Sequence, residues 1–526
     1  MKINKYFVIA GLCTASLSTI TSCKKSSFDE LYRDPSKVTE TTIEKQFTGI
    51  LYTYRELVIP TYRNYFVTLA PTTHRYIQTI GWQNADEQLT PGAAAITDRW
   101  ERYYQGLTQF REFEKIYNAA PELEKNDKKI FYLAAKIFFY DMTQQQVDLH
   151  GDIPWSEAGK LSTNGGNYTI SYPKYDKATD IYTAMLDDLK AINTELTNLK
   201  VAPGILTGFK TQDLVNSGSL DLWRKYCNSL RLRMLTRVGQ VQAFSARTNQ
   251  EIADILNSAP LVLENKDNIQ VDIVDIATDI NSKGFRDALE SWNNNIAGKT
   301  MIDDMVAKAD PRLPYMFEPG PGAAGKYMGL DPALPVASQA ELLINTTTNP
   351  SKITTYNRST YSRNERFPGI LITAAEVKFL IAEFRLRGGN DASAKTSFED
   401  GIRASIEMQQ NIRTASNNND VAVPAPTTGE QINKYISNVG WGGNKIQLIA
   451  MQKWLHFNII QSTENWSEVR RLDYPTFAFR VAPSDRQKTV PVRWNIAQSE
   501  LSNNGTNYDA VKAQDNVNTK LFWDVN

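Results

Sequence analysis

Apolar residues recur three and four positions apart over several long stretches of the chain, and this spacing predicts amphipathic α-helices. The predicted helices run from Thr97 to about Ala119, from Asp127 onward, from Asp176 or Thr179 onward, and over residues 219–240. Each predicted start lies at a residue type that commonly caps a helix N-terminus. The pattern therefore favours an all-α protein.

The clearest unit lies at residues 371–411, where two helical runs follow one another. Gly388-Gly389-Asn390 separates the runs, and Asp391 is expected to cap the second helix. Two helices of this length joined by a glycine turn have tetratricopeptide-like dimensions. The run Ala134-Ala135-Lys136-Ile137 resembles Ala374-Ala375-Glu376-Val377, which indicates either a faint internal repeat or two unrelated buried helices that each need alanines.

Between about residues 241 and 370 the composition shifts towards Gly, Pro, Asn and Thr. This stretch is too long to be a simple connection, so we expect a functional region or a small irregular subdomain. The predicted single body over 41–526 has tetratricopeptide-like helical hairpins at about 41–240 and 371–411, a large loop-rich ligand-binding region at about 241–370, and a C-terminal helix (444–462) with an irregular tail within 431–526.

The first residues have the pattern of a secretory signal peptide, because Lys2 and Lys5 precede an apolar stretch that ends in Ile20-Thr21-Ser22-Cys23. This ending resembles a bacterial lipobox, in which the cysteine receives lipid and becomes the first residue of the mature chain. Several acyl chains hold a protein stably on a membrane. We therefore predict a signal peptide over 1–22, lipidation of Cys23 and a tether over 23–40. The alternative is a plain signal peptide with an incidental cysteine.

Charge and motif content narrow the function classes. Lys+Arg 58 and Asp+Glu 58 give a net charge of zero, which argues against a general nucleic-acid binder. The sequence lacks the H-E-x-x-H, G-x-S-x-G and Cys-x-x-Cys motifs, and its three histidines are far apart. Gly298-Lys299-Thr300 ends like a phosphate-binding loop, but Asn293 replaces the required glycine. We therefore predict no catalytic residue, no metal and no cofactor.

Aromatic residues are the remaining candidates for binding chemistry. Flat rings stack on the C–H faces of sugars while amides and acids bond the hydroxyl groups, and the same surface suits a peptide. The alternative for each ring is that it packs a loop onto the core. The aromatic residues of the loop-like stretches are Tyr76, Trp82, Phe285, Trp292, Tyr315, Tyr327, Tyr356, Tyr361 and Trp441.

Several short motifs, in order along the chain, resemble one protein family. They are the lipobox at Cys23, Gly151-Asp152-Ile153-Pro154-Trp155, Trp223 to Arg233, Asp310-Pro311-Arg312-Leu313-Pro314, Ala374-Ala375-Glu376-Val377 with Ala382-Glu383, Gln452-Lys453-Trp454, Glu468 to Asp473, Pro491-Val492-Arg493-Trp494 and Phe522 to Asn526. Together they resemble the SusD/RagB-like nutrient-binding outer-membrane lipoproteins, particularly the starch-binding-associated branch. Asn495 after Trp494 and Phe384 after Glu383 depart from the family pattern.

The resemblance implies a lipid-anchored, non-catalytic protein of the cell outer membrane. Its helical hairpins would dock on a SusC-like TonB-dependent transporter, and its loop-rich part would hold a nutrient, commonly an oligosaccharide and in some members a peptide. It further implies that Trp223 belongs to the core and that Arg470 and Arg471 tie loops to helix carbonyls.

In the family, ligand contacts come from segments that correspond here to about 74–90, 280–300 and 355–365. The ligand-contacting residues that we predict within them are Tyr76, Trp82, Asn84, Trp292, Asn293 and Tyr361. The leading hypothesis is glycan capture. Peptide capture, a scaffold without a small ligand, and a secreted hydrolase are the alternatives.

Overall fold

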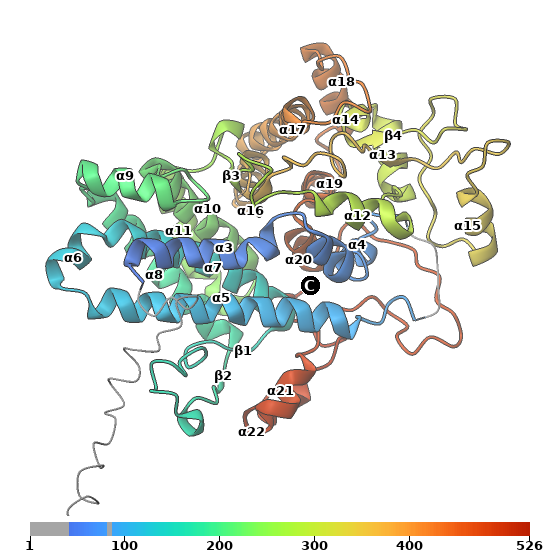
Figure 1. Cartoon of the computed structure of the whole chain (residues 1–526). Coiled ribbons are helices and arrows are strands. Elements are labelled where there is room, and N and C mark those ends of the chain that lie inside the picture. Colours follow the sequence, from blue (N-terminus) through green and yellow to red (C-terminus); the bar gives the residue numbers. More distant parts are fainter. Residues whose placement is uncertain (1–40, 82–86) are drawn as a thin grey trace, which may run out of the picture. The chain divides into compact units, whose positions relative to one another are not determined.

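Helices form most of the chain in the computed structural model, which describes residues 41–81 and 87–526 (Figure 1). The predicted all-α class with tetratricopeptide-like hairpins is confirmed. Within the described residues, strands are limited to short antiparallel pairs, so helix packing rather than a sheet organises the core. Residues Ile43–Asn526 form one compact unit.

The N-terminal half contains α3 (Ile43–Val58), a π-helical segment η1 (Arg63–Leu69), α4 (Thr73–Tyr76), α5 (Ala93–Ala119), α6 (Glu122–Asp127), α7 (Lys129–His150), η2 (Tyr168–Ile170), α8 (Ala178–Asn198), α9 (Pro203–Gln212), α10 (Leu220–Val238) and α11 (Gln242–Ser258). The C-terminal half contains η3 (Asn265–Asp267), α12 (Gly284–Glu290), η4 (Ser291–Asn293), α13 (Lys299–Lys308), α14 (Leu313–Met316), α15 (Val336–Leu343), α16 (Ala374–Arg387), α17 (Asp391–Ala415), α18 (Gly429–Val439), α19 (Lys445–Phe457), α20 (Ser462–Leu472), α21 (Gln498–Asn503), α22 (Gly505–Tyr508) and η5 (Lys512–Gln514).

The short strands pair segments that are distant in sequence. The pairs are β1 (Ile153–Pro154) with β2 (Tyr175–Asp176), β3 (Ile269–Val271) with β6 (Gly369–Ile372), and β4 (Phe317–Glu318) with β5 (Thr355–Tyr356). The β4–β5 pair ties two parts of the loop-rich region together.

Predicted helix starts agree with the structure within a few residues. The Ser219 side chain accepts a hydrogen bond from the backbone N–H of Leu222 and caps α10 as expected. The prediction for Thr97 was wrong, because α5 already begins at Ala93: Gly92 stands at its N-cap and three alanines with high helix propensity follow.

The α16–α17 hairpin is the clearest predicted unit, and its helices pack closely. Gly401 of α17 lies against the ring of Phe379, so closely that an added Cβ would stand 2.5 Å from that ring. The side chain of Asn390, rather than that of the predicted Asp391, caps α17 by accepting a hydrogen bond from the backbone N–H of Ser393. An asparagine side chain at this turn satisfies one of the free N–H groups of the helix.

Two other boundaries needed correction. The region after residue 241 begins with a regular helix, α11, whose buried face includes Phe244, Ile252 and Ile255. The predicted helix over 444–462 corresponds to α19 but ends earlier, at Phe457, because the chain turns at Asn458, where φ is 42°; α20 begins only at Ser462. The rest of the loop-rich region carries only short helices and strands, as predicted.

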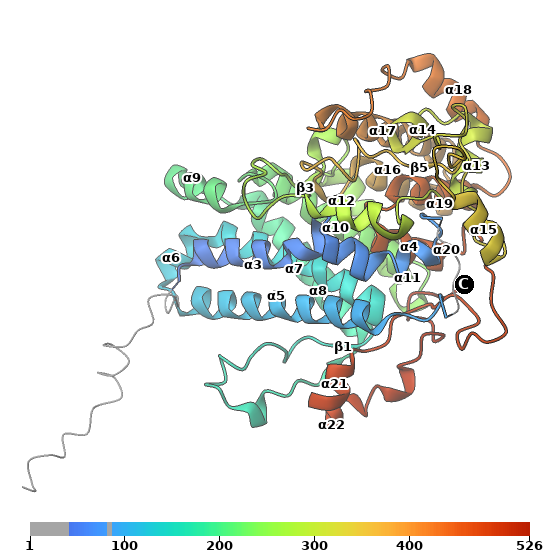
Figure 2. The same ribbon diagram turned by 45° about the vertical axis from the view of Figure 1, so that its right-hand side comes forward.

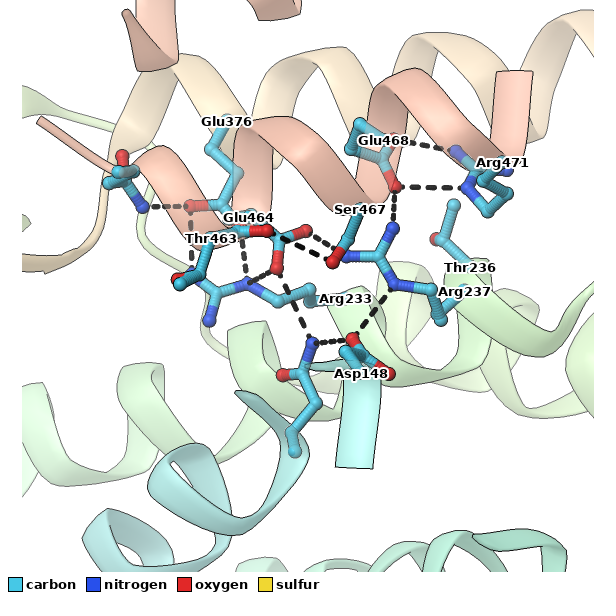
Figure 3. Close-up of polar contacts among 12 residues, drawn as sticks. Asp148, Arg233, Thr236, Arg237, Glu376, Thr463, Glu464, Ser467, Glu468 and Arg471 are labelled. Atoms are coloured by element: carbon cyan, nitrogen blue, oxygen red, sulfur yellow. Dashed lines mark hydrogen bonds and ion pairs between the residues drawn. The ribbon is translucent and has the colours of Figure 1, made fainter. Parts of the chain in front are cut away.

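A buried network of charges joins helices from both halves of the chain, and Figure 3 shows its centre. Arg237 of α10 has no exposed side-chain surface, and its Nε lies 3.1 Å from Oδ2 of Asp148 on α7. The same guanidinium pairs with Glu464 and Glu468 of α20. Arg233, one helical turn earlier, pairs with Glu376 of α16 at 2.5 Å. These ion pairs fix α10 against three other helices.

A second part of the network surrounds Glu383 of α16. Its carboxylate accepts hydrogen bonds from Lys453 Nζ at 2.8 Å and from Arg471 at 2.7 Å. Burial alone would raise the pKa of Glu383, but the charges of Arg471 and Lys453 hold it well below its ordinary value. Arg471 thus pairs with carboxylates, which corrects the prediction that it bonds helix carbonyls.

The two other residues with an implied structural role behave as expected. Arg470 donates to the backbone carbonyls of Val492 and Asp148, both at 2.8 Å, and so ties the C-terminal tail to the end of α7. Trp223 is fully buried. Both assignments are confirmed, and they connect the irregular tail to the helical core.

Candidate ligand-binding site

The three loop segments predicted to contact ligand meet in the structure. Gly81 donates its backbone N–H to the carbonyl of Ile296 at 2.9 Å, and Tyr356 donates its backbone N–H to the carbonyl of Asn295 at 2.7 Å. Isolated β-bridges join Ile80 to Ala297 and Ile296 to Thr355. Segment 291–298 therefore lies between the other two, on the side of the compact unit where α12, α13 and α15 are drawn in Figure 2.

Trp292 stands on a strained and exposed turn at this junction. Its φ is 55° and that of Asn293 is 60°, so two consecutive non-glycine residues adopt the left-handed conformation. The Trp292 side chain is 88% exposed. A large ring held in solvent by strained backbone costs stability, and such strain is typical of binding sites.

An ion-pair cluster braces the start of this turn. The carboxylate of Glu290 accepts hydrogen bonds from Arg363 Nε at 2.9 Å and from Ser362 Oγ at 2.7 Å. Arg363 also donates to Asp420 at 2.6 Å. Burial would raise the pKa of Glu290, but the hydrogen bonds from Arg363 and Ser362 outweigh it and hold the pKa below its ordinary value. The cluster therefore fixes the end of α12 immediately before Trp292.

Glu290→Gln is expected to lower the free energy of unfolding by about 1 kcal/mol at pH 7, because it removes a partly buried ion pair. The pKa of Glu290 is depressed in the folded state, so its contribution is present above the ordinary pKa of 4.5 and disappears as the pH falls further. Urea unfolding at pH 7 and at about pH 3.5 measures the free energy of unfolding of both proteins. The difference in this free energy between wild type and Glu290→Gln is expected to be smaller at the lower pH.

The matched control is Glu264→Gln. Glu264 pairs with Lys266 at 2.6 Å, but both side chains are mostly exposed to solvent, so its loss is expected to change stability much less than Glu290→Gln does. Equal effects of the two variants at pH 7 would show that the Glu290 cluster does not brace the turn.

Tyr361 and its neighbours form a buried layer under the junction. The ring of Tyr361 is fully buried, and its hydroxyl donates to Gln409 Oε1 at 2.8 Å. The hydroxyl of Tyr356 donates to the carbonyl of Thr79 at 2.6 Å. In this arrangement Tyr361 supports the loops from below and offers no ring face to a ligand. Phe285 and Tyr315 are buried in the same way, so the core-packing alternative holds for these loop aromatics.

Tyr76, at the end of α4, is also buried. Its ring packs on Trp466 at a centroid distance of 5.5 Å, and it lines a cavity of about 360 Å³ together with Phe477 and Phe479. The hydroxyl of Tyr76 has no hydrogen-bond partner among the described residues. Tyr76 therefore packs against α20 rather than beside Trp292.

Trp82, Asn84 and Cys23 lie outside the described residues. The described residues that flank Trp82 and Asn84 contact a C-terminal segment: Gln78 donates to the carbonyl of Ala478 at 2.6 Å, and Glu87 receives a hydrogen bond from Arg486. The structure thus brings residues 296–298, a few positions after Trp292 and Asn293, next to segment 78–81, which leads directly to Trp82.

A family model described as "Starch-binding associating with outer membrane" matches residues 35–496. The chain belongs to this SusD-like family. Among solved structures, a chitin-binding protein is 22% identical, with a TM-score of 0.73, over 91% of this chain and 100% of its own. A SusD homologue from Bacteroides fragilis NCTC 9343 is 19% identical, with a TM-score of 0.73, over 92% and 100%. No curated protein sequence matches the chain.

A SusD/RagB family protein from Bacteroides thetaiotaomicron VPI-5482 extends the comparison. It is 16% identical to this SusD-like chain, with a TM-score of 0.69, over 92% of this chain and 99% of its own. At these identities the solved structures establish the shared fold, whereas the family match establishes membership and the association with the outer membrane.

The described part of this SusD-like protein contains few other side chains suited to acid–base chemistry or metal binding. Its three histidines, His74, His150 and His456, are buried, and burial lowers the pKa of each to about 3. The residues at 41–81 and 87–526 contain no group of three His, Cys, Asp or Glu side chains placed to hold a metal ion. No described helix is both long and apolar enough to cross a membrane.

The three residues whose ion pairs hold the end of α12 before Trp292 were not predicted from the sequence. Glu290, Arg363 and Asp420 come from three separate segments, and charged residues in loops usually face solvent without a partner. Only their spatial convergence identifies them, and no motif in the sequence signals it.

Proposed function

We propose that the chain is a non-catalytic, lipid-anchored outer-membrane protein that captures a nutrient oligosaccharide and delivers it to a SusC-like TonB-dependent transporter. The supporting observation is Trp292: an 88% exposed ring on a strained, ion-pair-braced turn where three loop segments meet. A ring in this position stacks on a sugar face, and the side-chain amide of Asn293 hydrogen-bonds hydroxyl groups. Trp82 and Asn84 are proposed to complete the contact.

Calorimetry against starch and chitin oligosaccharides, other neutral glycans and oligopeptides tests the ligand class. The family description refers to starch, and one structural neighbour is named as a chitin-binding protein, so both glycans belong in the panel. We expect saturable binding of at least one oligosaccharide without turnover and with co-purification of a transporter. Binding of peptides alone would favour the peptide-capture alternative, and a transporter without any small ligand would favour the scaffold.

Lipidation is the second part of the proposal. Metabolic labelling with palmitate is expected to mark the wild-type protein and to leave Cys23→Ser unlabelled, because the thiolate is the group that receives the lipid. Mass spectrometry of the mature wild type is expected to show an acylated N-terminal peptide that begins at Cys23. A mature protein that begins at another residue would contradict the lipobox assignment.

A further inference from the structure

The segment between β1 and β2 leaves the helical core and exposes large apolar side chains. Tyr168 is 67% exposed, Ile170 64% and Tyr172 53%. Single exposed apolar residues are ordinary on protein surfaces, but three within five positions make a patch. This patch contributes nothing to the described core, so another surface is its expected partner.

Hydrogen bonds hold this loop in one shape. At its tip, the side chain of Asn164 donates to the carbonyl of Ile170 at 3.2 Å, and Asn167 caps η2 by accepting from the N–H of Thr169. At its base, the amides of Asn504 and Asn507 donate to the carbonyls of Pro173 and Tyr172. The apolar side chains are thus presented by an ordered backbone, which lowers the entropic cost of binding.

The loop carries a small net positive charge. Between β1 and β2 its charged residues are Lys160, Lys174 and Glu157, and the carboxylate of Glu157 accepts a hydrogen bond from the backbone N–H of the exposed Lys174. A patch of tyrosine, isoleucine and lysine suits the interface of an anionic lipid surface, where aromatic rings lie at the headgroup level and lysines attract phosphate. The amide groups beside the rings, those of Asn164, Asn504 and Asn507, donate to backbone carbonyls of the loop, whereas a glycan site would use such amides for hydroxyl groups.

The loop also lies where a lipid anchor can bring it to a membrane. In both views it lies in the same half of the compact unit as the start of α3 (Figures 1 and 2). Only residues 23–40 separate the proposed acylated Cys23 from the first described residue, and this length spans at most about 60 Å when fully extended. Any body on such a tether stays close to the bilayer.

We propose that this loop is a second membrane contact, which inserts Tyr168, Ile170 and Tyr172 into the headgroup region of an anionic lipid surface. The inference rests on the proposed lipid anchor of Cys23. One lipid-modified residue limits the distance of the body from the membrane but does not set its orientation. A second contact fixes the orientation as well, and it keeps the ligand-binding turn at Trp292 facing one direction.

The test uses residues 24–526, which contain the whole compact unit but no acylated cysteine. Sedimentation with phosphatidylethanolamine–phosphatidylglycerol vesicles is expected to show binding, and with phosphatidylcholine vesicles weaker binding. The triple variant Tyr168→Ser, Ile170→Ser, Tyr172→Ser is expected to bind the anionic vesicles roughly tenfold or more weakly, because it removes the inserted apolar surface. Lys160→Gln with Lys174→Gln is expected to reduce the preference for anionic lipid.

The control variant is Leu123→Ser with Val274→Ser. These side chains are 74% and 85% exposed elsewhere on the compact unit, so their loss is expected to leave vesicle binding unchanged. Circular dichroism of every variant confirms the fold. Absence of vesicle binding, or equal binding by the triple variant, would overturn the proposal. Loss of transporter co-purification with unchanged vesicle binding would also overturn it and would assign the patch to a protein partner.

The result is separable from the proposed function. The triple variant is expected to keep the glycan affinity of the wild type, because the loop shares no residue with the junction at Trp292. An unacylated Cys23 would remove the anchor from the proposed function, whereas the vesicle assay would still report on the loop alone.

Discussion

Replacing Arg237 by methionine is expected to lower the free energy of unfolding by about 3–5 kcal/mol. The substitution removes the positive charge between Asp148, Glu464 and Glu468 and leaves three buried carboxylates without their shared partner. Glu468 keeps Lys453 and Arg471, but Asp148 and Glu464 lose their nearest cation. A buried charge without its cation keeps its desolvation cost, which methionine cannot offset although it fills a similar volume. Urea unfolding followed by circular dichroism measures the change.

Two further variants distinguish the loss of the buried positive charge from the loss of side-chain packing as the cause of the lower stability. Arg247→Met removes ion pairs with Asp187, whose side chain is 66% exposed, and with Glu251, which keeps its pairing with Arg231, and is expected to cost about 1 kcal/mol. Arg237→Lys keeps the charge but cannot reach three carboxylates at once, so an intermediate loss is expected. If Arg237→Met were as stable as Arg247→Met, the network would not hold α10 against α7 and α20.

The helices could be predicted because their signal is local. The spacing of apolar residues located α7, α8, α10 and the α16–α17 hairpin within a few residues. α11 was missed because its buried face includes Thr248 and Glu251, which break the apolar stripe. The charge network could not be predicted at all, since Arg237 and Glu464 are 227 positions apart in the sequence.

The sequence predicted which loop segments meet at the candidate site, but not which aromatic side chains in those segments are exposed. Trp292 and Tyr361 have the same sequence signature, an aromatic residue in a polar loop, yet one is 88% exposed and the other is fully buried. The difference arises from tertiary contacts: Tyr361 finds Gln409 on α17 and Trp292 finds no covering element among the described residues. Composition therefore selects candidates, and only packing decides which of them face a ligand.

Trp292→Ala is expected to weaken glycan binding about 30-fold, because a stacked tryptophan at a binding site commonly contributes about 2 kcal/mol. The side chain is almost fully exposed, so the same change is expected to alter the free energy of unfolding by less than about 0.5 kcal/mol. Calorimetry gives the Kd and urea unfolding gives the stability, and a loss of affinity without a loss of stability assigns the ring to ligand contact.

Trp292→Gly sharpens this test because it separates backbone strain from the ring. Glycine adopts a φ of 55° without steric cost, so this variant is expected to be at least as stable as Trp292→Ala although binding is equally lost. Trp292→Phe keeps a ring and is expected to retain part of the affinity, whereas Tyr168→Ala, an exposed ring outside the site, is expected to leave Kd unchanged. An unchanged Kd for Trp292→Ala would remove the turn from the ligand site, because an exposed tryptophan on strained backbone would then bind nothing that the glycan panel contains.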